Sequence, residues 1–283
     1  MPVHIADRRG RRGRRTRIAT AAAALVAVLA VATPLTAAAA PAHAASAPLV
    51  DEVDVARGDV SGFGGGVVFA PEAPTGTTLG AVVITPGFRD SHADMRWYGE
   101  ALADAGYVAF TIDTLGTLDL PGRRAQETLA AVDYLTGSSA VAAEVDASRV
   151  AVLGYSMGGG GVIRAALARR DLKAVVAVEP FDVPSSYPSD TTPTLIITGQ
   201  SDRIAVPFLM GRRMYDSIPA LTPKEYIELR GAGHTAGVRT PDDTIRDAAT
   251  TFLDRYLDGN ASVSICPAPA ATGPISESAA YCG

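Results

Sequence analysis

A single serine stands among glycines in the stretch Gly154-Tyr155-Ser156-Met157-Gly158, which fits the pattern G-x-S-x-G. The stretch lies where a short apolar run of buried-strand type, Val150 to Leu153, gives way to a segment with helical spacing. In a strand-to-helix turn of this kind the serine backbone takes a positive φ angle, and glycines two positions away on either side relieve the crowding. We therefore predict that Ser156 is a nucleophile. The alternative, a glycine-rich turn that binds phosphate or only packs, lacks G-x-G-x-x-G and a following Walker lysine.

A serine hydroxyl is a weak nucleophile and needs a general base within hydrogen-bond reach. The sequence has four histidines, of which His4 and His43 fall in an N-terminal segment that we expect to be removed. His234 lies in a loop between the last predicted strand and the last predicted helix, where the order nucleophile, acid, base of α/β-hydrolases requires the base. We predict His234 as the base, because His92 lies upstream at the start of a predicted helix, where a capping or surface role is expected.

The imidazole needs an acid that orients it and stabilises its charged form. Asp202 follows the buried strand-like run Leu195 to Thr198 and a glycine loop, so we expect its carboxylate at the carboxyl end of that strand. Glu179 and Asp182 follow the preceding strand and are the competing candidates, although as bare loop residues they are expected to be solvated. We predict Asp202 from the position expected for the acid.

A tetrahedral oxyanion needs two backbone N–H donors. Met157 supplies one, because it follows the nucleophile at the N-terminus of a predicted helix. The stretch Thr85-Pro86-Gly87-Phe88 follows an earlier strand, and its proline and glycine allow a sharp turn. We predict that the N–H of Phe88 is the second donor, the alternative being an ordinary hydrophobic loop residue.

Strand-like and helix-like segments alternate along the chain and would position these residues. Several strand-like runs are apolar throughout, as expected of parallel strands buried on both faces. The alternation predicts the α/β-hydrolase fold, a doubly wound and mostly parallel α/β sheet, with the glycine-rich stretch 51–78 as an antiparallel edge. The predicted strands are Gly66 to Ala70, Ala81 to Thr85, Val108 to Ile112, Val150 to Leu153, Ala174 to Val178, Leu195 to Thr198 and Tyr226 to Leu229. The predicted helices are about Ala93 to Ala105, Arg123 to Leu135, Gly158 to Arg169, Val206 to Ser217 and Asp242 to Leu257.

The segment before the predicted strand Leu195 to Thr198, which leads to Asp202, is short. Only Pro180 to Pro193 separates that strand from the one before it, and this segment has three prolines beyond its first residue and little helical pattern. We therefore predict no lid or cap domain, and a shallow groove that is open to bulky substrates.

The first 44 residues differ from the rest of the chain. Seven arginines precede an apolar run from about Ile18 to Leu35, and Ala42-His43-Ala44 follows. This order is typical of an export signal, so we predict a signal peptide over residues 1–44 with cleavage after its last residue, and a single catalytic domain over residues 45–283. A membrane anchor is the alternative, which the alanine content of the run and Pro34 disfavour, and both Sec and Tat export stay open.

The predicted mature chain is strongly acidic. It keeps 18 of the 25 basic and 29 of the 30 acidic side chains, so its net charge is −11. Such a protein is a poor partner for nucleic acid or an anionic membrane, and we expect a secreted monomer with neutral or small substrates. Its two cysteines, Cys266 and Cys282, are predicted to form a disulfide worth about 3 kcal/mol. The sequence has no Cys/His cluster with metal-ligand spacing, and we predict no metal and no cofactor.

Several stretches resemble the secreted actinobacterial cutinases and polyester hydrolases, the group that includes poly(ethylene terephthalate)-degrading enzymes. They are VVITPGF, FTIDTLGTLDLPGRRAQ, SRVAVLGYSMGGGG, DLKAVVAVEPF, PTLIITGQSD and the paired cysteines near the end, and together they cover nearly the whole predicted mature chain. The resemblance implies the triad Ser156, Asp202 and His234. It also implies an oxyanion hole from the backbone of Phe88 and Met157, and activity on cutin-like aliphatic polyesters, short-chain p-nitrophenyl esters and triglycerides.

The sequence departs from that family beside the expected ester site. The family usually has tryptophan at the position of Phe181 and often an aromatic residue at the position of Thr235, whereas Phe88 stands where tyrosine or phenylalanine is common. We predict that Phe88, Phe181 and Thr235 contact the substrate, with a reduced aromatic clamp for a terephthalate ring. Tyr155 stands where the family commonly has histidine or tryptophan, which we expect to be a packing change.

Several members of that family bind a divalent cation through three carboxylates near the acid loop and the tail. Gln200 and Arg230 stand in place of two of them, and Glu277 matches the third. A cation would meet a positive charge there, so we predict no metal at this place. An ion pair between Arg230 and Glu277 is one substitute that the residues allow.

The sequence as a whole predicts a secreted serine ester hydrolase that cleaves carboxylic esters through an acyl-enzyme. The predicted substrates are aliphatic polyesters and short-chain esters, with poly(ethylene terephthalate) as a further candidate. A carboxylesterase or lipase for small or emulsified esters, without activity on polymers, is the first alternative. A non-catalytic extracellular binding protein is the second, but it would have no need to keep the serine, acid, base and both oxyanion loops, all of which are present.

Overall fold

Strands and helices alternate through the part of the chain that the computed structural model describes, residues 50–283. The predicted signal peptide and its cleavage site lie outside these residues. The strands are β1 Val50–Val55, β2 Gly66–Pro71, β3 Leu79–Thr85, β4 Val108–Ile112, β5 Val145–Tyr155, β6 Val175–Val178, β7 Thr194–Gly199, β8 Lys224–Leu229 and β9 Ile275–Tyr281. The helices are α1 Arg96–Asp104, α2 Pro121–Gly137, α3 Met157–Ala168, α4 Gly211–Ser217 and α5 Asp243–Tyr256, with short 3₁₀ turns at Arg57–Asp59, His92–Met95 and Ala142–Glu144.

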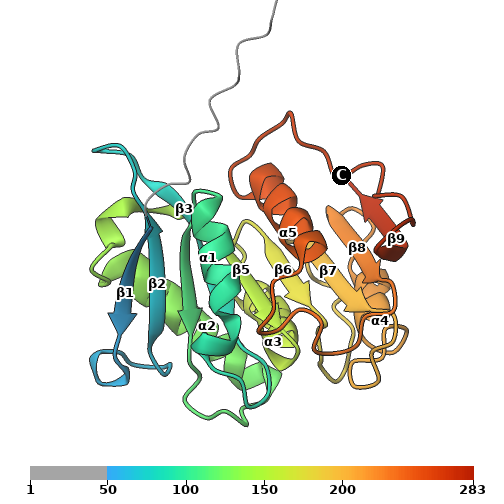
Figure 1. Ribbon diagram of the computed structural model, residues 1–283, viewed down its shortest axis with the longest axis horizontal. Helices are drawn as coiled ribbons and strands as arrows, with labels where there is room; N and C mark the ends of the chain where they lie inside the picture. The colour runs from blue at the N-terminus through green and yellow to red at the C-terminus, as the bar shows by residue number, and fades with distance from the viewer. Residues whose placement is uncertain (1–49) are drawn as a thin grey trace, which may run out of the picture. The chain divides into compact units, whose positions relative to one another are not determined.

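The strands form one sheet in the order β1-β2-β4-β3-β5-β6-β7-β8-β9 (Figure 1). Neighbours from β4 through β3 to β8 are parallel, whereas β1, β2 and β9 pair antiparallel at the two edges. The central strands are buried along nearly their whole length, which explains why they are apolar on both faces. The predicted doubly wound, mostly parallel α/β sheet is therefore confirmed. The loops after β3, β5, β6, β7 and β8 leave the carboxyl ends of these strands and gather along that end of the sheet, which is called the carboxyl edge below.

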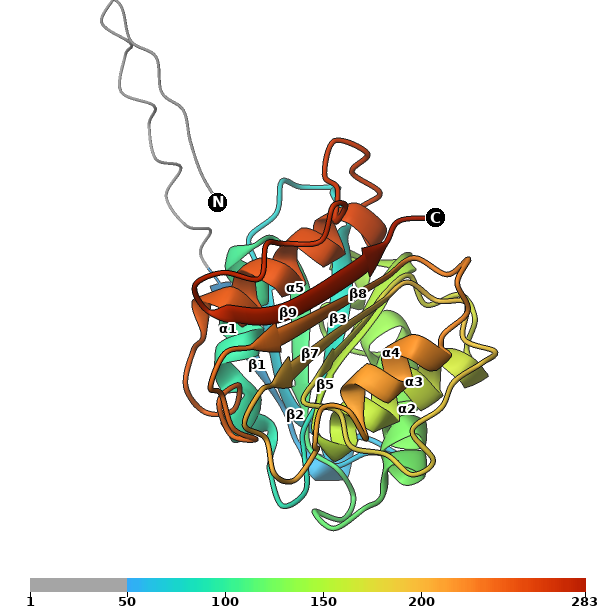
Figure 2. The same cartoon turned by 90° about the vertical axis from the view of Figure 1, so that its right-hand side faces the viewer.

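Helices cover both faces of this sheet. Figure 2 views the sheet from the β9 edge, with α1 and α5 on one side and α2, α3 and α4 on the other. One apolar core includes Leu102 of α1 and Phe252 of α5, and the other includes Leu135 of α2, Ile163 of α3 and Met214 of α4. Two cores of this kind fix the strand ends from both sides, so the loops at the carboxyl edge start from rigid positions.

Most predicted elements occur, with differences at some ends and in the tail. Strand β5 begins at Val145 instead of Val150, and α1 begins at Arg96 after a 3₁₀ turn instead of at about Ala93. The helix predicted from Val206 begins only at Gly211, because residues 206–210 form turns in which the N–H of Met210 donates to Val206 and that of Arg212 donates to Pro207. No strand was predicted in the C-terminal tail, yet β9 pairs antiparallel with β8 at the sheet edge. The predicted disulfide between Cys266 and Cys282 is present beside it.

The segment between β6 and β7 contains no helix or strand, as expected for a chain without a lid at this place. Within residues 50–283, none of the helices combines the length and the apolar character that crossing a bilayer requires.

Candidate active site

Ser156 occupies a strained turn between β5 and α3. Its φ angle is +52°, a conformation that is uncommon for a residue with a side chain. A Cβ atom on Gly158 would lie 2.9 Å from the carbonyl carbon of Thr85, and one on Gly154 would lie 2.8 Å from the nitrogen of Gly159, so both positions require glycine. The Ser156 N–H donates to Val178 at the end of β6 at 3.0 Å. The turn predicted from G-x-S-x-G therefore holds Ser156 at the carboxyl edge of the sheet.

Three side chains from different loops form a hydrogen-bonded chain at this edge. Ser156 Oγ lies 2.9 Å from Nε2 of His234, whose Nδ1 lies 2.7 Å from Oδ2 of Asp202. The other carboxylate oxygen of Asp202 accepts from the backbone N–H groups of Ile204 at 2.7 Å and Ala205 at 2.9 Å. The structure thus brings together the predicted nucleophile, base and acid. Two backbone N–H groups hold the carboxylate of the acid in place.

The loop that carries His234 is held by two tyrosines. Tyr155, next to the serine, donates its hydroxyl proton to the carbonyl of His234 at 2.5 Å, and the two rings lie 5.4 Å apart. Tyr98 on α1 donates to the carbonyl of Gly237 at 2.6 Å. Tyr155 therefore does more than pack, because its hydroxyl makes a polar contact with the residue that we predict as the base.

The two predicted oxyanion donors both have free N–H groups. Within the described residues, neither the N–H of Phe88 nor that of Met157 donates a hydrogen bond to the protein. Met157 is the first residue of α3, where an N–H has no partner inside the helix and the helix dipole favours negative charge. Phe88 and Met157 both line the cleft that holds Ser156, so their N–H groups are available to an oxyanion there.

Arg124 on α2 holds the Phe88 loop in place. Its side chain is fully buried and donates to the carbonyls of Pro86 at 3.0 Å, Thr117 at 2.9 Å and Asp119 at 2.8 Å. Burial lowers the pKa of this guanidinium below its usual value. Our sequence analysis missed this residue, although its place on the helix face that also carries Thr128 was a usable signal.

An open cleft of about 260 Å³ lies over Ser156 and His234. All three residues predicted to contact the substrate, Phe88, Phe181 and Thr235, line it. Phe88 is 43 % exposed, and the N–H of Phe181 donates to the carbonyl of Ser156 at 2.8 Å, which ties the loop after β6 to the nucleophile. Aromatic side chains from two loops therefore line the cleft that holds Ser156.

The competing base does not reach the serine. Nδ1 of His92 forms a hydrogen bond with the Asp113 carboxylate at 2.9 Å, and the backbone N–H of His92 donates to the same carboxylate at 2.8 Å. Ser91, not His92, caps the short helical turn that follows. The capping role that we considered for His92 is thus wrong, and its partner is Asp113.

The two competing acids are both buried, which contradicts the expectation that they are solvated. Asp182 pairs with Arg164 at 2.5 Å and accepts from the hydroxyl of Tyr187 at 2.5 Å, away from the imidazole. Glu179 is fully buried, and its Oε2 lies 4.0 Å from Nδ1 of His234. Burial first, and then the charges of Asp202 and Asp242, raise the pKa of Glu179 to about 9.

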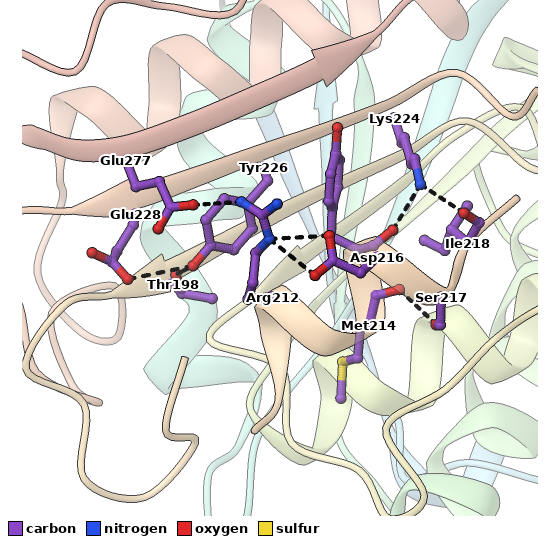
Figure 3. Close-up of polar contacts among 11 residues, drawn as sticks. Thr198, Arg212, Met214, Asp216, Ser217, Ile218, Lys224, Tyr226, Glu228 and Glu277 are labelled. Atoms are coloured by element: carbon purple, nitrogen blue, oxygen red, sulfur yellow. Dashed lines mark hydrogen bonds and ion pairs between the residues drawn. The ribbon is translucent and has the colours of Figure 1, made fainter. Parts of the chain in front are cut away.

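The expected ion pair between Arg230 and Glu277 is wrong. Figure 3 shows that Glu277 instead meets Arg212 of α4, which also contacts Asp216 one turn along the helix at 3.1 Å. Arg230 donates to the backbone carbonyls of Gly273 at 3.0 Å and Ile275 at 2.8 Å. Arg230 is occupied by the backbone that leads into β9, so a different arginine reaches Glu277.

Comparison with known proteins agrees with this geometry. A protein-family model described as "PETase: PET hydrolase-like" matches residues 31–283. A bis(hydroxyethyl) terephthalate hydrolase of Streptomyces coelicolor is 38 % identical over 235 residues, which cover 82 % of this chain and 76 % of that protein. The cutinase est2 of Thermobifida alba is 41 % identical over 243 residues, or 84 % of this chain and 80 % of that protein. Cutinase 1 of Thermobifida cellulosilytica is 40 % identical over 231 residues, which cover 80 % of this chain and 87 % of that protein.

Proposed function

We propose that this chain, which belongs to the PET hydrolase-like family and is a carboxylic ester hydrolase, cleaves its substrates with Ser156, His234 and Asp202. The observation that supports these roles is the unbroken chain of hydrogen bonds from Ser156 Oγ through the imidazole to the Asp202 carboxylate, at the floor of an open cleft. A nucleophile joined to a base, and a base joined to an acid, is the arrangement that acyl transfer needs.

The first half of the reaction forms an acyl-enzyme. Ser156 Oγ attacks the ester carbonyl carbon while His234 Nε2 takes its proton, and Asp202 holds the other ring nitrogen as the N–H donor. The negative charge that develops on the carbonyl oxygen is stabilised by the N–H groups of Phe88 and Met157. The intermediate then collapses, the bond to the alcohol oxygen breaks, and the alcohol leaves with the proton from His234.

The second half releases the acid. His234 takes a proton from a water molecule, whose oxygen attacks the acyl carbon and forms a second tetrahedral intermediate. When this intermediate collapses, the bond to Ser156 breaks and the serine oxygen recovers the proton from His234. The enzyme returns to its starting state, and the carboxylic acid diffuses away.

The substrates that we propose are aliphatic polyesters and short-chain esters. The cleft is open, its rim carries exposed apolar side chains such as Phe88 and Ile204, and no helix covers it between β6 and β7. An accessible groove of this kind suits a chain that lies across the surface. Relatives that are named as cutinases and as a bis(hydroxyethyl) terephthalate hydrolase support this substrate class.

The test of the reaction is Ser156→Ala assayed with p-nitrophenyl butyrate. We expect the variant to fold and to lose turnover, whereas Ser61→Ala, which changes an exposed serine outside the cleft, keeps the wild-type rate. A Ser156→Ala protein that hydrolyses the ester at the wild-type rate would refute the proposed role. Soluble product released from a polycaprolactone film then separates a polyester hydrolase from an esterase that acts only on small or emulsified esters.

We also propose that residues 1–44 are a cleaved signal peptide, that the mature protein is secreted as a monomer, and that residues 45–283 are one catalytic domain. The arginine-rich start, the apolar run and Ala42-His43-Ala44 support the signal peptide and secretion. N-terminal sequencing of the protein recovered from culture medium tests them, with Ala45 expected as the first residue.

A further inference from the structure

Glu179 is a buried acid that the proposed reaction does not use. It follows the last residue of β6 with a φ angle of +45°, and its N–H donates to Ile197 of the neighbouring strand at 2.6 Å. The residue is 0 % exposed, and among residues 50–283 neither of its carboxyl oxygens finds a hydrogen-bond partner. A polar group that is buried in this way is costly, so its presence beside the site calls for an explanation.

The carboxyl group of Glu179 faces the same edge of the imidazole as Asp202 does. Its Oε2 lies 4.0 Å from Nδ1 of His234, and these two atoms and a carboxylate oxygen of Asp202 all lie within 4.8 Å of one another. A Cβ atom on Gly199 would lie 3.1 Å from Oε1 of Glu179, so the glycine at the end of β7 leaves room for this carboxyl.

The other titratable groups around Glu179 are few. Asp242 at the N-terminus of α5 adds a negative charge, and the hydroxyl groups of Tyr98 on α1 and Tyr155 on β5 complete the set. Burial raises the pKa of both tyrosines, so they are neutral at physiological pH. With two carboxylates nearby and no basic side chain except the imidazole, Glu179 holds its proton at neutral pH.

We propose that Glu179 is a second acid of the site, a positioning residue that faces the same ring nitrogen of His234 as Asp202 and carries the negative charge there when residue 202 is replaced by a neutral one. This inference rests on the proposed function, because it concerns the acid of the same triad. In the wild-type protein Asp202 is the anion and Glu179 is the protonated partner. If the charge of residue 202 is removed by substitution, Glu179 ionises more readily. At a pH above its remaining pKa it releases its proton to solvent and becomes the anion that faces the imidazole, so the total charge of the pair is then restored.

The variant Asp202→Asn exposes this second acid. Asparagine can keep the hydrogen bonds to the N–H groups of Ile204 and Ala205, but its NH₂ group faces Nδ1 and favours the wrong imidazole tautomer. In a triad with a single acid this change costs about 10⁴-fold in kcat. Here Glu179 no longer meets a neighbouring charge on residue 202, so it ionises more readily, and the activity of Asp202→Asn is expected to rise with pH.

The experiment compares kcat of Asp202→Asn with kcat of Asp202→Asn/Glu179→Gln at about pH 6 and about pH 8.5 on p-nitrophenyl butyrate. At the lower pH, where Glu179 is protonated, we expect nearly equal kcat values for the two variants. At the upper pH, the ratio of kcat of Asp202→Asn to kcat of the double variant should be about tenfold higher. Purely structural damage by Glu179→Gln would lower the double variant by the same factor at both pH values. A ratio that rises less than about threefold therefore overturns the proposal.

The matched control is Glu225→Gln in the Asp202→Asn background. Glu225 is also a buried carboxyl, with its pKa raised to about 7 by burial, but it lines a separate cavity of about 410 Å³ beside α5. This control is expected to keep the pH profile of Asp202→Asn. If the double variant with Glu179→Gln does not fold, the single variant serves instead: the kcat/KM profile of the wild type should show an ionisation near pH 9 that Glu179→Gln lacks, and identical profiles overturn the proposal.

Failure of this inference is distinguishable from failure of the proposed function. Ser156→Ala in the same assay reports on the reaction itself, because wild-type turnover in this variant would mean that Ser156 is not the nucleophile. The ratio between the two Asp202 variants reports only on the second acid.

Discussion

Replacing Glu179 by glutamine should change how the stability of the protein depends on pH. Glutamine is close in size to the protonated acid and does not titrate, so the substitution removes one ionisation and little volume. Glu179 has a pKa of about 9 in the folded protein and an ordinary carboxyl value of 4.5 when exposed. Between these values the folded chain binds a proton that the unfolded chain does not bind.

The magnitude follows from this difference in proton binding. Because the folded state holds the extra proton, the contribution of Glu179 to stability is fully present below about pH 4.5 and is lost as the pH rises towards 9. In this window the loss is about 1.4 kcal/mol for each pH unit. From about pH 6 to about pH 8, the free energy of unfolding of Glu179→Gln should therefore rise relative to that of the wild type by about 2.7 kcal/mol.

The assay is urea unfolding of both proteins at about pH 6, 7 and 8, with the disulfide intact. The amide of glutamine adds its own cost, because the carboxyl it replaces has no hydrogen-bond partner among the described residues. That cost is the same at every pH. Other buried acids such as Glu225 titrate in this range, but they contribute equally to both proteins, so only the change of the difference with pH is informative. A difference that stays constant within about 0.5 kcal/mol over this range would show that Glu179 is already ionised at neutral pH.

Three further predictions concern specificity and stability. Phe181→Trp should enlarge the aromatic surface beside Ser156 and raise the rate on bis(2-hydroxyethyl) terephthalate relative to p-nitrophenyl butyrate by about threefold, and an unchanged ratio of rates would count against contact between this side chain and the ring. Asp182→Asn should lower the free energy of unfolding by about 3 kcal/mol, measured with urea, because it removes the charge that pairs with Arg164 and replaces one of the two oxygens that accept from Arg164 and the Tyr187 hydroxyl by an NH₂ group; a loss below about 0.5 kcal/mol would contradict this. Replacing Cys266 and Cys282 together by serine should cost about 3 kcal/mol in the same assay, since the disulfide closes a segment with a sequence separation of 16, and equal stability would refute the estimate.

The sequence predicted the central sheet well because its signals are local. The strands β2, β3, β4, β6 and β7 are short and largely apolar runs between turns, and Gly154 and Gly158 mark the strained turn by their spacing alone. The edge strand β9 has no such signal: its residues Ile275–Tyr281 are mostly half-buried, small or polar, and they form a strand because β8 offers an unpaired edge. Pairing partners of this kind are set by the tertiary fold.

The site was predictable where one residue type at one place in the chain decides the chemistry. Ser156, His234 and Asp202 follow from motif, order and position, and the structure brings them into contact. The roles of buried charges were not predictable, because burial depends on segments that are distant in sequence. Glu179 lies near Asp202, His234 and Asp242, which belong to later segments of the chain. Arg212 meets Glu277 (Figure 3) because α4 packs against β7 and β8, and β8 pairs with the edge strand β9.

The central claim is that Ser156 is the nucleophile of an ester hydrolase, and covalent labelling tests it most directly. Diethyl p-nitrophenyl phosphate transfers its phosphoryl group to an activated serine and releases p-nitrophenolate, which can be counted by absorbance. We predict that one p-nitrophenolate is released for each chain, that ester hydrolysis is lost in proportion, and that peptide mass spectrometry finds the adduct on Ser156. Complete loss of activity with the adduct on another residue, or full activity with Ser156 labelled, would contradict the claim.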